Sequence, residues 1–437
     1  MSDSDAATGE PLTVVRRAPF SDNPLVGARG LRTQQQILDA ALKAFGDVGY
    51  HRASIERIAK DAGCSRVAFY QYFSDKADVF RHLAAQVDRQ VNASIDRLAP
   101  VTPGADGWDA LRDWVERYAE VRSLYEPVFR AFPAAAESDA LLAGASLRTH
   151  GRYGVAIQSR VTGSPLPPRE LTPVIELSQE HLARTLEALA TMRTAAPEAF
   201  PTSRVLDAFV DVMHRSLFGL QVDVNVHDGH HPRPPRLPFG PVMRSALARG
   251  VGVDDAPPVP GKAYQQLVDA GRTVFAERGY HGTRVDDIVE AAGVSHGAFY
   301  RYFKNKAEFA HLLAAQAMRT VSATLIEMPD PTDDAPGRAS LRRWLRSYNA
   351  AQTSETAMLR VWADAGVDEG GLVSDSASML DWGRRRMTRY LGARGFGDAD
   401  IEALVLLALV DAIGVRERPA ATIDAALHII ETGFLGR

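Results

Sequence analysis

Residues 65–80 read SRVAFYQYFSDKADVF, and residues 295–310 read SHGAFYRYFKNKAEFA. These two stretches are part of a longer repeat in the 437-residue chain. With a shift of about 230 positions, residues 32–87 align without a gap to residues 262–317, and about 23 of the 56 pairs are identical. The same shift pairs Trp114 with Trp344. The repeat therefore predicts two related modules of about 200 residues each, a normal size for domain-scale units.

The pattern within each copy predicts four helices. In the first copy an apolar stripe over residues 33–48 has helical spacing, and Gly49 can end that helix in the left-handed conformation. A short helix follows and ends at Gly63, after which Ser65 can cap a third helix. The fourth helix begins near Asp75 and is long. Two short helices joined by a tight glycine turn and braced by two others predict a helix-turn-helix.

The run GYHRASIERIAKDAGCSRVAFYQYFSDKADVF (49–80) and the run GYHGTRVDDIVEAAGVSHGAFYRYFKNKAEF (279–309) resemble the TetR family of bacterial transcriptional regulators. The resemblance implies an all-α fold of two tandem helical modules, each an N-terminal helix-turn-helix DNA-binding domain followed by a helical regulatory and dimerisation domain. Two positions depart from the family pattern. Ala53 stands where the family usually has a threonine that caps the second helix, whereas copy two keeps Thr283, and Val67 stands where glycine or a small residue is common, whereas copy two has Gly297.

These observations predict six segments along the chain. The N-terminal arm and the Pro/Gly-rich linker are set by composition, and the other boundaries follow the repeat. The segments are a flexible arm (1–31), DNA-binding domain 1 (32–87), regulatory domain 1 (88–222), the linker (223–261), DNA-binding domain 2 (262–317) and regulatory domain 2 (318–437).

The resemblance implies that the third helix of each copy reads bases and that the start of the fourth contacts phosphates. The residue types suit this, because arginine pairs with guanine, glutamine pairs with adenine, and a lysine beside a helix N-terminus favours an anion. The predicted base-facing residues are Arg66, Val67, Tyr70 and Gln71 in copy one and His296, Gly297, Tyr300 and Arg301 in copy two. The predicted phosphate contacts are Ser65, Tyr72 and Lys76, with Thr283, Ser295, Tyr302 and Lys306.

The two copies differ in charge. Lysine and arginine exceed aspartate and glutamate by about two over residues 51–82, whereas the two signs cancel over 281–312. Arg29 and Arg32 also precede the first copy and could act as a basic arm, while the second copy has only Lys262 there. The first copy is therefore expected to contribute more binding energy.

The resemblance implies a pocket for a small apolar effector and a helical dimer face in the remainder of each module. Trp114 and Tyr118, with Trp344 and Tyr348, are candidate pocket residues, although aromatic residues at helical spacing also suit plain core positions. Residues 203–220 and 399–416 are the expected packing faces, as an intramolecular pseudo-dimer or in a homodimer.

Composition excludes several other classes. The formal net charge of −4 is not that of a histone-like basic polymer, and the single cysteine, Cys64, allows no intramolecular disulfide. The longest apolar run, residues 403–410, is too short for a membrane helix, and we expect a cytoplasmic protein without membrane contact. No phosphate-binding, zinc-hydrolase or serine-hydrolase motif occurs, so we expect no enzyme, no cofactor and no metal site. The histidines at 227, 230 and 231 are interpreted as part of a polar linker.

Two functional hypotheses follow. In the first, the chain is a covalently fused pseudo-dimer that binds an operator in double-stranded DNA and responds to a ligand, as a repressor would. In the second, one copy binds DNA and the other is a degenerate head used for dimerisation or sensing, which the charge difference favours.

Overall fold

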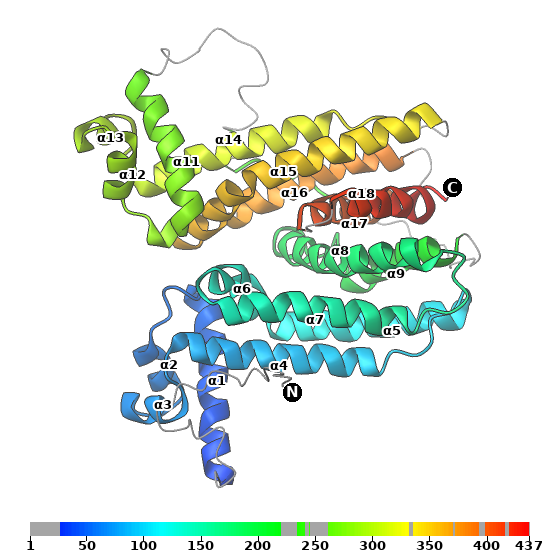
Figure 1. Ribbon diagram of the computed structural model, residues 1–437, viewed down its shortest axis with the longest axis horizontal. Coiled ribbons are helices and arrows are strands. Elements are labelled where there is room, and N and C mark those ends of the chain that lie inside the picture. Colours follow the sequence, from blue (N-terminus) through cyan, green and yellow to red (C-terminus); the bar gives the residue numbers. More distant parts are fainter. Residues whose placement is uncertain are drawn as a thin grey trace, which may run out of the picture. The chain divides into compact units, whose positions relative to one another are not determined.

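The computed structural model describes residues 27–219, 234–240, 244, 261–331, 335–369, 372–392, 398–415 and 419–436. Apart from one isolated bridge between Val101 and Val161, every element in these ranges is a helix, which confirms the all-α prediction (Figure 1). Residues 1–26 of the predicted arm and the three linker histidines lie outside the described residues. Among the described helices, none combines the length and the apolar character needed to cross a bilayer.

The chain divides into two compact units. Unit 1 consists of Met1–Val91 and Val121–Ser146, and unit 2 consists of Asn92–Glu120 and Leu147–Arg437. The first helix-turn-helix therefore belongs to unit 1, whereas the second belongs to unit 2 together with the C-terminal helices of both modules.

The first module begins with the four predicted helices. They are α1 (Ala28–Val48), α2 (Ile55–Asp61), α3 (Arg66–Tyr72) and α4 (Lys76–Asp96). Because α1 begins at Ala28, Arg29 and Arg32 lie in its first turns, and the last residues of the predicted arm are helical. The remaining helices are α5 (Ala105–Leu124), α6 (Glu126–Ser138), α7 (Ala140–Gln158), α8 (Pro168–Ala195) and α9 (Thr202–Phe218).

The second module repeats the first four helices. They are α11 (Lys262–Gly282), α12 (Val285–Ala292), α13 (His296–Tyr302) and α14 (Lys306–Ile326). The C-terminal part consists of α15 (Ala335–Glu369), α16 (Leu372–Leu391), α17 (Ala399–Ala412), the short η2 (Ile413–Val415), α18 (Pro419–His428) and η3 (Ile429–Phe434).

The modules differ where α5 and α6 correspond to the single long helix α15. Pro127 lies in the first turn of α6, and the repeat shift places Ala357 at the matching position inside α15. A proline in a helix interior removes one backbone hydrogen bond and clashes with the carbonyl four residues earlier. The proline therefore explains why the first module has two helices where the second has one.

Each helix-turn-helix has its own apolar core. In unit 1 the aromatic rings of Phe45, Phe69 and Phe80 are buried, and Val128 of α6 packs against the same cluster. In unit 2 Phe275, Phe299 and Phe309 occupy the equivalent core, which Met358 and Val361 of α15 complete. Burial of a phenylalanine side chain contributes about 1.5–3 kcal/mol to stability. These rings therefore hold together the helices of each head, as we call α1–α4 (head one) and α11–α14 (head two).

Within unit 2, helices of the first module contact helices of the second. The apolar helix α17 lies beside α8 and α9, and α9 lies beside η3 (Figure 1). The ring Nε2 of His181 on α8 is 2.8 Å from the carbonyl oxygen of Val405 on α17. Arg215 on α9 donates from Nε to the Gly433 carbonyl over 2.7 Å. A Cβ added to Gly433 would overlap Ser216 Oγ, so the glycine permits the close approach of α9 and η3.

Candidate nucleic-acid interface

The first head is built by capping groups that the sequence provides. Ser54 accepts a hydrogen bond from the Arg57 amide at the start of α2, and Gly63 turns the chain with φ 68°. Ser65 then accepts from the Ala68 amide over 3.1 Å and begins α3. A non-glycine residue is strained at positive φ, so Gly63 fixes the angle between the two short helices.

The second head has the same geometry. Gly293 turns the chain in the left-handed conformation with φ 63°, and Ser295 accepts from the Ala298 amide over 3.3 Å. The start of α12 differs from the prediction, because Thr283 does not cap it. Instead, the Asp287 carboxylate accepts from the Arg284 amide over 2.7 Å, which lowers the pKa of Asp287.

One face of each third helix is core and the opposite face is exposed. Phe69 and Phe299 are fully buried. In contrast, Val67 is 73% exposed, and Tyr70 and Tyr300 are 46% and 55% exposed. The third helix of each head therefore presents a tyrosine to solvent on the side opposite its buried phenylalanine.

The predicted base-facing residues of the first head lie on this exposed face. Arg66 pairs with Glu56 on α2, with 2.7 Å between Nη1 and Oε1, and its guanidinium lies 5.8 Å from the Tyr70 ring centre. Gln71 is exposed beside them. The acidic partner Glu56 was not anticipated from the sequence, and it competes with any base for the arginine.

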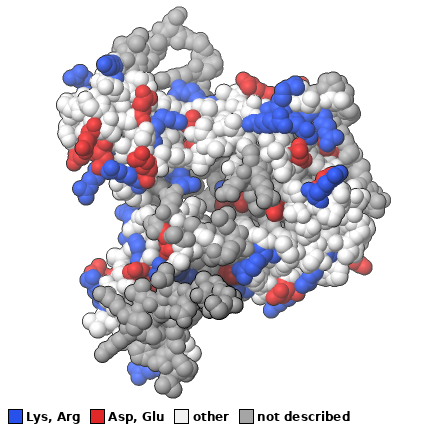
Figure 2. Space-filling view, in the orientation of Figure 1, with Lys and Arg blue, Asp and Glu red and all other residues white. Residues whose placement is uncertain are grey.

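The second head repeats the arrangement with other residue types. His296 Nε2 lies 3.4 Å from an oxygen of Asp286 on α12, so an acidic residue again faces the first residue of the third helix. Gly297 and Arg301 are exposed. On the face in Figure 2, basic and acidic side chains are mixed over the head formed by α11–α13. Both heads thus present polar groups suited to reading base edges.

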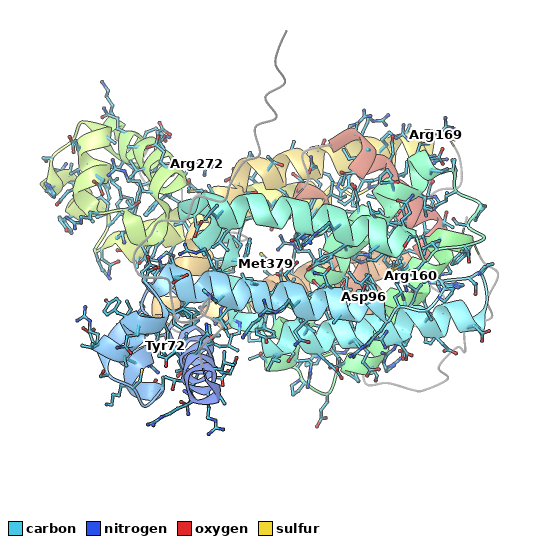
Figure 3. All side chains as sticks on the ribbon, turned by 60° about the horizontal axis from the view of Figure 1, so that its bottom comes forward. Tyr72, Asp96, Arg160, Arg169, Arg272 and Met379 are labelled. Atoms are coloured by element: carbon cyan, nitrogen blue, oxygen red, sulfur yellow. The ribbon has the colours of Figure 1, made fainter. Side chains whose placement is uncertain are left out.

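The predicted phosphate contacts fall into two groups. The hydroxyls of Ser65 and Ser295 are exposed while they cap their helices, and Tyr72 and Tyr302 are half-buried. Tyr72 comes from α3 and is labelled in Figure 3. Thr283, in contrast, is 1% exposed and donates from Oγ1 to the Gly279 carbonyl, so its phosphate contact stays a prediction that its burial disfavours.

Lys76 and Lys306 have a structural role that the sequence did not reveal. Lys76 Nζ donates to the carbonyl oxygens of Tyr50, His51 and Ala53 at 2.6, 3.1 and 3.2 Å. Partial burial lowers the pKa of the Lys76 ammonium. The ammonium also lies 4.6 Å from the Tyr50 ring centre, a cation–π distance. This side chain ties the start of α4 to the loop before α2.

The matched lysine makes the same connection in the second head. Lys306 Nζ donates to the carbonyls of Tyr280 and Thr283 at 2.7 and 2.9 Å and lies 4.2 Å from the Tyr280 ring centre. A lysine of this kind can place positive charge near a phosphate while it holds the loop, so the predicted role and the structural role are compatible.

The candidate pocket residues are mostly buried. Trp114 is 3% exposed and its indole Nε1 has no hydrogen-bond partner, while Tyr118 is half-buried with its ring 6.1 Å away. In the second module the Trp344 Nε1 donates to the Thr324 carbonyl over 2.7 Å. The Tyr348 hydroxyl donates to Asp411 over 2.7 Å, and burial, with the nearby Asp411 carboxylate, raises the Tyr348 pKa. The two modules therefore differ in whether this indole donor is satisfied.

No group of three or more histidine, cysteine, aspartate or glutamate side chains suited to a metal ion occurs in the described parts of the chain.

Comparison with known proteins agrees with this geometry. The profile of the family described as "Bacterial regulatory proteins, tetR family" matches residues 37–83 and 267–313, one segment in each head. The chain is 30% identical over 177 residues to the transcriptional regulator AcuR of Cereibacter sphaeroides, which covers 38% of this chain and 74% of AcuR. It is 41% identical over 71 residues to the HTH-type transcriptional repressor DhaR of Mycobacterium sp. strain GP1, covering 15% of this chain and 36% of DhaR. With the HTH-type transcriptional repressor LfrR of Mycolicibacterium smegmatis it shares 35% identity over 112 residues, covering 24% and 57%.

The paired profile matches and the alignment with most of AcuR agree with the two heads seen in the structure: the chain belongs to the TetR family of bacterial regulatory proteins and carries two modules of that family in tandem.

Proposed function

We propose that the chain is a ligand-responsive repressor that binds an operator in double-stranded DNA through both heads. The observation that carries the proposal is the matched exposed face of α3 and α13, which presents Tyr70 and Gln71 in one head and Tyr300 and Arg301 in the other. Tyrosine, glutamine and arginine supply the stacking and hydrogen bonding used to contact bases. A repressor of this kind needs no catalytic activity. It would act in the bacterial cytoplasm, where the chromosome lies.

We propose that the two modules pair within one chain. The contacts of α8 and α9 with α17 and η3 support this, since they join the C-terminal helices of the two modules. Helix-turn-helix regulators of two-fold form contact half-sites one helical turn apart, about 34–36 Å. The domain division at residues 32–87, 88–222, 223–261, 262–317 and 318–437 is part of the same proposal.

The effector is proposed to be a small, mostly apolar molecule that binds in the first module. The buried Trp114 indole supports this, because an N–H group without a partner in a core costs free energy that a ligand acceptor would recover. An effector of this kind lowers DNA affinity only if it binds the DNA-free state more tightly. In a thermal-shift panel, ligands that stabilise the protein should act less on Trp114→Phe.

A second candidate function is a regulator with one working head. The observation that favours it is that head two presents His296 and Gly297 where head one presents Arg66 and Val67, and its charges cancel. Such a head would hold the operator weakly or only serve to pair the modules.

Selection of bound DNA from a random pool, with the mass of the purified protein measured in solution, tests these proposals. A chain of monomer mass that enriches an imperfect palindrome is expected, and its affinity should fall with salt at a slope of about −0.9 per phosphate contact. Gln71→Ala should relax specificity in one half-site by about 1–3 kcal/mol and Arg301→Ala in the other. If only Gln71→Ala has an effect, head two is degenerate. A pool with no enriched sequence, or a stable dimer of chains, would contradict the proposal.

A further inference from the structure

Residues 234–240, here called the strap, form neither helix nor strand and contact α16 of the second module through two backbone amides. The Leu237 amide donates to Asp381 Oδ2 over 3.1 Å, and the Gly240 amide donates to Ser378 Oγ over 3.4 Å. Asp381 and Ser378 are fully buried. The strap backbone therefore supplies donors to acceptors that have no access to water.

A phenylalanine of the strap enters an apolar cluster. Phe239 packs with side chains from α14, α15 and α16 (Met379, on α16, is labelled in Figure 3). The members of this cluster are Ala314, Ala315, Met318, Leu359, Trp362, Met379 and Trp382. It adjoins the core of the second head, because Leu359 packs against both clusters, but Phe239 belongs to this cluster alone.

The fit at the end of the strap is close. A Cβ added to Gly240 would overlap the Asp375 carboxylate, and Asp375 is only 3% exposed. Position 240 thus accepts no side chain without displacement of the strap or of Asp375.

The strap differs from an ordinary surface loop in which of its side chains are buried. Leu237 and Phe239 are partly buried and Gly240 is buried, while Pro235, Arg236 and Pro238 are exposed. Connecting segments usually lie on the surface with their polar groups in water. Here the apolar side chains and two amides turn inward, as in a bound peptide.

The strap site also contains balanced charge. Asp381 pairs with Arg384, with 2.8 Å between Oδ1 and Nη2, and with Arg385. Arg384 pairs in turn with Asp400. Asp381 Oδ2 accepts from the strap as well as from Arg385, so departure of the strap would remove one of the hydrogen bonds of a buried carboxylate.

We propose that the strap is a built-in ligand of the second module, a mostly apolar peptide that occupies the site between α14, α15 and α16 and holds α14 in one position. The same helix begins at Lys306, whose ammonium ties it to the loop of head two. The strap therefore fixes the second module from within, whereas the first module keeps the unsatisfied Trp114 donor.

The test uses the full chain and a synthetic heptapeptide of residues 234–240, PPRLPFG. Phe239→Ala should lower the thermal midpoint of the second module by on the order of 5 °C and raise hydrogen exchange in residues 306–326. The peptide should bind this variant saturably, change the fluorescence of the site tryptophans and restore the midpoint. Gly240→Ala, which keeps every strap side chain, should accept the peptide in the same way.

Arg236→Ala, at an exposed position of the same strap, is the matched control. It should keep the wild-type midpoint and, like the wild type, bind no peptide because the site is filled. A lower midpoint in Phe239→Ala without peptide binding would make Phe239 an ordinary core residue and overturn the proposal. An unchanged midpoint would overturn it too.

Discussion

The two heads have the same backbone plan but are attached differently to the rest of the protein. In unit 1 the first head packs against α6, a helix that begins anew after α5 with Pro127 in its first turn. In unit 2 the second head packs against α15, which continues for 35 residues, and Arg272 joins α11 to the buried Glu355 over 2.6 Å. A repeated helix-turn-helix can thus be joined to the helices that follow it through a broken helix or a continuous one.

The greatest loss of stability is expected when a proline is placed inside α15 at the position that matches Pro127. Ala357→Pro should lower the free energy of unfolding by about 3 kcal/mol or more, because it removes a hydrogen bond in the interior of α15. Pro127→Ala should change it by less than about 1 kcal/mol, since position 127 is in the first turn of a helix. Denaturant unfolding measures both.

Ala357→Gly is the control for Ala357→Pro, because it weakens helix propensity by about 1 kcal/mol without breaking the backbone hydrogen bond. If Ala357→Pro lowers the free energy of unfolding no more than Ala357→Gly does, the continuity of α15 does not contribute to stability.

Lys76 and Lys306 should each stabilise the head in which they lie. Lys76→Met and Lys306→Met should each destabilise their own head by about 1–3 kcal/mol, because carbonyl oxygens lose their donor. Both should also weaken binding to all DNA sequences, and Lys76→Met should do so more, given the more basic surroundings of head one. Hydrogen exchange resolves the stability of each head, and salt titrations give the DNA affinity.

Lys60→Met, at an exposed position of α2, should leave the stability of head one unchanged. Unchanged stability in Lys76→Met would show that its carbonyl contacts carry no free energy. Equal losses of DNA affinity from the two lysine variants would show that the heads do not differ as proposed.

A pH dependence tests the contact between α8 and α17. Burial lowers the pKa of His181 to about 4, below the value near 6.5 of an unfolded chain. The unfolded state then binds a proton that the folded state does not, so stability falls as the pH drops from about 6.5 toward 4. The slope from this residue approaches about 1.4 kcal/mol per pH unit.

Comparing the wild type with His181→Gln isolates the contribution of His181 protonation to the free energy of unfolding. The stability advantage of the wild type should shrink as the pH falls from 7.5 to 5. A constant difference over that range would mean that His181 does not stay neutral in the folded protein.

The smallest expected effect concerns the acidic partners of the third helices. Glu56→Gln should release Arg66 and raise DNA affinity by no more than about 1 kcal/mol, since exposed ion pairs are weak. Asp286→Asn should change affinity less, because His296 forms an ion pair only when protonated. Binding titrations on one operator would measure both, and a loss of affinity in Glu56→Gln would mean that Glu56 orients Arg66 for DNA.

The sequence predicted the helices of each head because their boundaries depend on local chemistry. Gly63 and Gly293 need no distant partner to adopt positive φ, and Ser65 and Ser295 cap helices through neighbouring amides. The exposed face of the third helix likewise follows from the burial of its phenylalanines.

Other features depend on chain segments that only the fold brings together. The carbonyls around Lys76 come from residues more than twenty positions earlier, and Phe239 meets side chains from three helices. For some of these contacts the sequence offers a weak signal. The repeat places acidic residues at both 56 and 286, and lysines at both 76 and 306. The expected cap at Thr283 is wrong, because a hydroxyl beside a helix start can also donate to a preceding carbonyl, and the Thr283 hydroxyl donates to the carbonyl of Gly279.

Arg215 and the Gly433 carbonyl meet from two different stretches of one polypeptide. In an assembly of two identical chains, each substitution at the shared surface appears twice and must suit its own copy. Here a substitution at position 215 alters one side of the surface, and a compensating change has to suit one neighbour. Each substitution therefore changes the contact once instead of twice. The two halves can therefore diverge residue by residue over generations while the surface that joins them persists, and under the proposed function each would adapt to its own half of an operator.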